Sequence, residues 1–112
     1  MIIEFKSNKL EKELKDINLA SKNYGGDIAR KIIQRLYEIQ AANSLNDLNR
    51  LPPTRCHRLK GNKKMYLAVD LKQPHRLIFI PLNNDGTIAD LDKVSMSDIH
   101  SVKIMEVSKH YD

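Results

Sequence analysis

Residues 65–82, MYLAVDLKQPHRLIFIPL, contain the segments that decide the fold. From Met65 to Leu71 apolar residues occupy every second position, as expected of a strand with one face toward a core. Lys72–Pro74 reads as a turn, and Arg76–Leu82 is apolar enough to be a central strand, buried on both faces. The stretch therefore predicts a strand, a turn and a second, more deeply buried strand.

Further strands are expected on both sides of this stretch. The residues Asn84-Asp85-Gly86 are a strong turn signal, and Asp85–Ser101 after them reads as an insertion with a short helical turn. Alternating or apolar patterns predict an opening edge strand over Ile2–Lys6, a strand over Cys56–Lys60 that ends in a turn at Gly61–Lys64, and a last strand over Val102–Val107.

Two helices are predicted in the first half of the chain. One runs from Lys9 to Leu19, and the other from Ile28 to Ala42, with Asp27 as its N-cap. The second carries an apolar stripe formed by Ile28, Ile32, Leu36 and Ile39. Helices followed by strands predict an α+β fold, with two N-terminal helices packed on one face of a small, mainly antiparallel, twisted sheet.

Composition limits the class of protein. The 112 residues fit one domain over 1–112, and 41% hydrophobic residues suffice for a core. The longest apolar runs, such as Leu77–Ile80, are too short to cross a bilayer, and the first residues lack the features of a signal peptide. Cys56 is the single cysteine and reads as core filler. We therefore expect a cytoplasmic protein with no membrane partner.

The charge is distributed unevenly along the chain. The net charge is +5, and the stretch from Arg50 to Lys64 contains basic residues and His57 but no Asp or Glu. An acid-free basic stretch favours a polyanion such as RNA, although it can also be an ordinary solvated face. The residues from Asn83 to Asp98 include Asp85, Asp90, Asp92 and Asp98, with Lys93 as the only basic residue.

Three features together resemble a known family. They are the two-helix start, the Pro-Pro entry into Arg55-Cys56-His57-Arg58-Leu59-Lys60-Gly61-Asn62, and the strand that carries His75-Arg76-Leu77-Ile78-Phe79. This order is similar to that of the RelE/ParE superfamily of toxins, in particular its HigB or plasmid maintenance system killer branch. The resemblance implies a RelE-like fold. It also implies a metal-independent, cofactor-free endoribonuclease, or mRNA interferase, that acts on mRNA, usually on the ribosome.

The resemblance also implies roles for individual residues. Cleavage by 2′-hydroxyl attack needs a base, an acid and cations that stabilise the charged transition state. Lys60 matches the family's lysine, Arg76 matches its arginine, and His57 matches a histidine that some members carry. Residues expected to contact the RNA are Arg55, Arg58, Lys63, Lys64 and Tyr66.

The C-terminal tail matches the family in residue type but not in order. The family's Asp-Tyr-His falls on Lys109-His110-Tyr111 here, followed by Asp112. His110 or Tyr111 is expected to take the role of the family's terminal histidine. The permutation leaves the identity of the general base open, and it also leaves open whether activity is reduced.

Two other functions share this fold. One is a ParE-like toxin that is not a nuclease and acts on DNA gyrase, and the other is a non-toxic RNA- or ribosome-binding module with a decayed site. The basic stretch, Arg76 and the tail favour the ribonuclease. A toxin of this branch implies a small helix-turn-helix antitoxin, similar to HigA, as partner. The acidic stretch from Asp85 to Asp98 is one candidate surface for it, and a solvated loop is the alternative.

Overall fold

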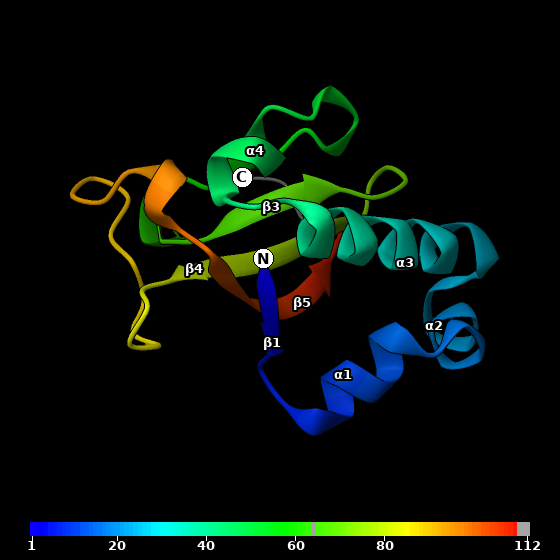
Figure 1. Ribbon diagram of the computed structural model, residues 1–112. Coiled ribbons are helices and arrows are strands. Elements are labelled where there is room, and N and C mark those ends of the chain that lie inside the picture. Colours follow the sequence, from blue (N-terminus) through cyan, green and yellow to red (C-terminus); the bar gives the residue numbers. More distant parts are fainter. Residues whose placement is uncertain (64, 110–112) are drawn as a thin grey trace.

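The computed structural model describes residues 1–63 and 65–109, with only the backbone of Lys63. One five-stranded sheet runs through the molecule in the order β1-β5-β4-β3-β2 (Figure 1). Its strands are β1 (Ile2–Phe5), β2 (His57–Arg58), β3 (Leu67–Asp70), β4 (Arg76–Leu82) and β5 (Ser101–Ser108). β1 pairs with β5 in parallel, and the other pairs are antiparallel. The predicted α+β class is confirmed, with β4 in the centre and β1 at an edge.

The first predicted helix is in fact two helices. α1 (Asn8–Lys15) and α2 (Ile17–Tyr24) are separated by Asp16, whose backbone is extended. The Asp16 carboxylate accepts hydrogen bonds from the backbone N–H groups of Asn18 and Leu19, so it caps the second helix. A continuous helix over Lys9–Leu19 was therefore wrong, because a good N-cap residue inside an apolar repeat starts a new helix.

The long helix α3 (Gly26–Ala41) confirms the second predicted helix and its buried stripe. Its N-cap is Gly25, with φ of 88°, and not Asp27 as predicted. Asp27 lies in the first turn, and its carboxylate binds Arg30 and Lys72 instead of capping the backbone. These two cations lower the pKa of Asp27, with the hydrogen bond from Lys72 as the largest cause.

Short elements complete the chain. They are α4 (Leu45–Asn49) and the 3-10 helices η1 (Pro52–Thr54), η2 (Gly61–Lys63) and η3 (Met96–Asp98). β2 and β3 are shorter than the strands predicted over Cys56–Lys60 and Met65–Leu71, because the turns on either side take their end residues. None of the helices in the described part of the chain has the length and apolar character needed to cross a membrane.

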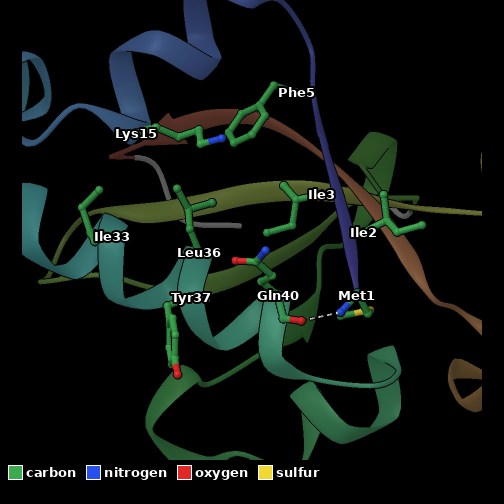
Figure 2. Close-up of a pocket in the computed structure, with 9 residues that line it drawn as sticks. All are labelled: Met1, Ile2, Ile3, Phe5, Lys15, Ile33, Leu36, Tyr37 and Gln40. Atoms are coloured by element: carbon green, nitrogen blue, oxygen red, sulfur yellow. Dashed lines mark hydrogen bonds between the residues drawn. The ribbon is translucent and has the colours of Figure 1, made fainter.

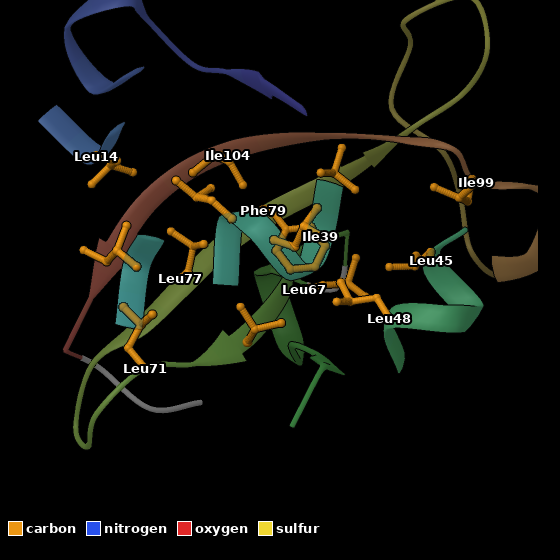
Figure 3. Close-up of a cluster of buried hydrophobic side chains, with 14 of the residues drawn as sticks. Leu14, Ile39, Leu45, Leu48, Leu67, Leu71, Leu77, Phe79, Ile99 and Ile104 are labelled. Carbon is orange, nitrogen blue, oxygen red and sulfur yellow. The ribbon is translucent and has the colours of Figure 1, made fainter. Parts of the chain in front are cut away.

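The main core lies between the sheet and the helices (Figure 3). Phe79 and Leu77 of β4 are fully buried there against Ile39 of α3 and Leu14 of α1. Each such side chain contributes about 2–3 kcal/mol by leaving water. The helices cover this face, and polar strand residues such as Asp70 and Arg76 lie on the opposite face.

Candidate functional site

The face of the sheet opposite the helices collects polar residues that are far apart in the sequence. His57 pairs with Ala68, and Asp70 pairs with Arg76, so all four side chains share one face. Ala68 belongs to a small second apolar cluster on this face, with Leu59, Ile78, Tyr66 and Met105. The sheet thus places His57 and Arg76 on the same face, on the two sides of β3.

Asp70 joins two of the predicted residues. Its carboxylate lies 3.0 Å from Nε of Arg55 and 3.6 Å from Nε of Arg76. The side chain of Arg55 is 74% exposed, whereas those of Asp70 and Arg76 are 13% and 16% exposed. The Asp70 carboxylate lies between two guanidinium groups, and a pair of arginines can hold a phosphate in the same way. The site is therefore cationic but already contains one anion of its own.

A buried arginine that sequence reasoning missed fixes this arrangement. Arg35 of α3 is only 3% exposed, and its Nε donates to the backbone carbonyl of Asp70 at 2.7 Å. Its Nη2 donates to the carbonyl of Pro53 at 2.8 Å, and its Nη1 binds Glu38 at 2.7 Å. Arg35 thus ties the helix to β3 and to the loop that leads to Arg55. The sequence offered one signal for a buried arginine: Arg35 lies next to Leu36 and three positions after Ile32, both of which belong to the apolar stripe.

The loop before β2 orients His57. Arg55 has a left-handed backbone with φ of 49°, and its carbonyl oxygen lies 2.8 Å from Nδ1 of His57. A carbonyl only accepts hydrogen bonds, so Nδ1 carries the hydrogen. In the neutral imidazole Nε2 is then free to accept a proton, which is the state that a general base needs.

Lys60 and Tyr66 lie at the other end of β2. The chain continues the antiparallel pairing there, because the Leu59 N–H donates to the Tyr66 carbonyl at 3.0 Å. Lys60 is exposed and precedes η2, and Tyr66 is partly buried against the second apolar cluster. Lys63 contributes only its backbone to the described structure, and Lys64 lies outside the described residues. Their predicted roles stay predictions.

Arg58 lies apart from the other basic residues. It pairs with Leu67, which faces the main core, so its side chain is directed to the helix-covered side. Both terminal nitrogens of Arg58 lie 3.2 Å from a carboxylate oxygen of Asp92. The basic stretch thus divides between two faces, and one residue of the acidic stretch has a partner inside the chain.

The last strand ends at the site. Ser108, the final residue of β5, pairs with Arg76. The predicted tail residues His110 and Tyr111 follow it and lie outside the described residues. Their part in the site stays a prediction.

Cys56 packs against the main core, on the opposite side of the sheet from His57. Burial raises the pKa of its thiol to about 12, so the thiolate is disfavoured and Cys56 is unsuited to act as a nucleophile. The interpretation of Cys56 as core filler is confirmed. Within residues 1–63 and 65–109 no three His, Cys, Asp or Glu side chains gather as metal ligands would.

The match to known proteins agrees with the sequence resemblance. A family model described as RelE-like toxin of type II toxin-antitoxin system HigB matches residues 3–94. The chain therefore belongs to the family of HigB-like toxins of type II toxin-antitoxin systems, which have an antitoxin as partner. A search of curated proteins found no match. The matched range includes His57, Lys60 and Arg76 but ends before β5 and the tail.

Proposed function

We propose that this toxin is an endoribonuclease that cleaves mRNA, on the ribosome, with its own side chains as the catalytic groups. The observation that carries the proposal is the placement of His57, Arg55 and Arg76 on one face of the sheet, around Asp70. Family membership supports a toxin, and this face has the charge and the proton acceptor that RNA cleavage needs.

Each group has a role in the proposed reaction, and the roles of Lys60 and of the tail residues rest on the family resemblance. Nε2 of His57 takes the proton of the RNA 2′-hydroxyl, whose oxygen then attacks the adjacent phosphorus. Arg55 and Arg76 hold the phosphate oxygens, and Lys60 stabilises the added negative charge of the transition state. The bond from phosphorus to the 5′ oxygen breaks, and that oxygen takes a proton from His110 or Tyr111. The products are a 2′,3′-cyclic phosphate and a 5′-hydroxyl end.

RNA phosphates and Asp70 compete for the same guanidinium groups in this scheme. Arg55 is the residue that can turn from Asp70 to an RNA phosphate, because most of its side chain is in solvent and its contact with Asp70 is made by Nε. Its two terminal nitrogens remain available to an RNA phosphate. Arg55 is therefore proposed to guide the RNA, while the less exposed Arg76 sits beside the reacting phosphate.

The test is expression of the chain without its antitoxin, combined with cleavage of ribosome-bound mRNA in vitro. Lys60→Ala with Arg76→Ala should abolish growth arrest and slow cleavage at least about a hundredfold. The matched control is Lys9→Ala with Lys22→Ala, which removes the same charge from exposed positions on the helices and should change neither result.

Two outcomes would contradict the proposal. A folded double variant that stays fully toxic would remove Lys60 and Arg76 from the mechanism. Growth arrest with intact mRNA and inhibited DNA supercoiling would instead support the ParE-like alternative that acts on gyrase. Thermal unfolding of each variant separates a lost site from a lost fold.

A further inference from the structure

An apolar groove between β1 and α3 plays no part in the proposed chemistry (Figure 2). Its walls are Ile3 and Phe5 on the strand and Ile33, Leu36 and Tyr37 on the helix. Tyr37 is 72% exposed, as an aromatic side chain at a binding surface would be before its partner arrives. The groove belongs to the β1 edge of the sheet, whereas His57 belongs to the β2 edge.

The strand that forms one wall has an open side. The N–H groups of Ile2 and Lys6 donate to the carbonyls of His100 and Ile104 at 2.9 Å, so these alternate residues bond toward β5. Ile3 and Phe5 lie at the intervening positions and direct their N–H and C=O groups the other way. In the part of the chain that the structure describes, no strand lies beyond β1. Such an edge accepts a further strand from another chain.

Each end of the groove carries a positively charged group. At one end the amino group of Met1 donates to the carbonyls of Ile39 and Gln40, at 3.1 and 2.8 Å, and thereby joins the start of β1 to the end of α3. At the other end Lys15 reaches over Phe5 (Figure 2). Lys15 pairs at 3.2 Å with Glu11, and the two side chains are 60% and 43% exposed. Such a surface pair is weak, so Lys15 can also bind a carboxylate from a partner.

We propose that this groove binds an extended, apolar segment of the antitoxin that carries an acidic residue. The segment adds to the sheet as a strand outside β1 and bonds to the backbone of Ile3 and Phe5. Its apolar side chains pack on Leu36 and Tyr37, and its carboxylate binds Lys15. A partner with carboxylates also suits a chain of net charge +5.

The groove suits this role better than the acidic stretch considered in the sequence. Asp92 in that stretch binds Arg58, and Asp85 accepts hydrogen bonds from Thr87, so both carboxylates have partners within the chain. The inference rests on the family's antitoxin partner and does not require the ribonuclease chemistry. A toxin that proves not to be a nuclease would leave it intact.

The first test is the affinity of the purified toxin for the antitoxin encoded beside it. Tyr37→Glu should weaken binding at least about tenfold, because it places a charge in the apolar groove opposite a carboxylate-bearing segment. Ile88→Glu is the matched control. Ile88 is 51% exposed and lies in the loop after β4, so binding should stay within about twofold. Equal effects of the two variants would overturn the proposal.

The second test measures whether the outward N–H groups of β1 become hydrogen-bonded to the antitoxin. Amide hydrogen exchange at Ile3 and Phe5 should slow on binding of the antitoxin. Ile3→Pro removes the outward N–H and should weaken binding several-fold more than Ile3→Ala, which keeps it. If the amides of Ile3 and Phe5 stay unprotected but Tyr37→Glu weakens binding, a helix of the antitoxin occupies the groove. If these amides are already protected in the free toxin, a second copy of the toxin occupies the groove. Either result would overturn strand addition by the antitoxin.

Discussion

The face around Asp70 and the groove beside β1 differ in how their polar groups are satisfied. On the first, Asp70 binds Arg55 and Arg76, and His57 bonds to the loop. On the second, the outward N–H and C=O groups of Ile3 and Phe5 face away from the sheet. The candidate site is thus held by contacts within the chain, whereas the proposed partner surface leaves its backbone hydrogen-bonding groups open.

The largest effects are expected when variants of each site are measured for both growth arrest and antitoxin affinity. Arg76→Ala with Lys60→Ala should abolish growth arrest but leave antitoxin affinity within about twofold. Tyr37→Glu should do the opposite, with full growth arrest and about tenfold weaker antitoxin binding. Growth assays and binding measurements on the same variants check this, and the separation of the two regions fails if either variant impairs both properties.

Arg35→Met tests how firmly the face around Asp70 is held. The change leaves the carbonyls of Asp70 and Pro53 and the carboxylate of Glu38 without their common partner. We expect the free energy of unfolding to fall by about 3 kcal/mol, measured by urea denaturation. Arg30→Met, at an exposed position of the same helix, should cost less than about 1 kcal/mol. A similar small loss for Arg35→Met would show that Arg35 does not anchor the site.

Asp70→Asn tests the anion that the site contains. Without the carboxylate, Arg55 and Arg76 no longer divide their charge between Asp70 and the RNA, so binding of single-stranded RNA at low salt should tighten about threefold to tenfold. Asp98→Asn makes the same change of charge at an exposed position and should have a smaller effect. Weaker binding by Asp70→Asn would mean that Asp70 orients the arginines more than it competes for them.

Cys56 gives a smaller effect that depends on pH. Its thiol pKa rises from 9.0 to about 12 on burial, so from pH 9 upward the unfolded chain loses this proton before the folded protein does. Stability is therefore unaffected below pH 9 and falls between pH 9 and 12. From pH 8 to 10 this group should account for about 1 kcal/mol of the loss in unfolding free energy. The loss should be smaller by that amount in Cys56→Ala, and equal losses would contradict the burial of the thiol.

Most of the fold could be predicted because its signals are local. The apolar alternation around β3, the buried run of β4 and the stripe on α3 each follow from the period of one element. The errors were also local in origin. Asp16 interrupts a helical repeat, and Gly25 rather than Asp27 caps α3, because capping depends on backbone conformation and not on residue type alone.

The candidate site was less predictable from the sequence. The family resemblance singled out His57, Lys60 and Arg76, and the register of β2, β3 and β4 brings His57 and Arg76 to one face. Charge counting treated Arg55 and Arg58 alike, yet one binds Asp70 and the other binds Asp92. Which carboxylate an arginine meets depends on strand pairing between residues far apart in the chain, and no local pattern records it.

The α+β class, the central strand and the resemblance to a toxin family could all be inferred from the sequence, because periodicity and motif order lie along the chain. Three features depend on the folded chain: Arg35 supports the candidate site, Asp70 lies between two arginines, and no described strand lies beyond β1 beside Tyr37. These features arise where distant segments meet, so they depend on which strands pair and on which face each side chain is buried.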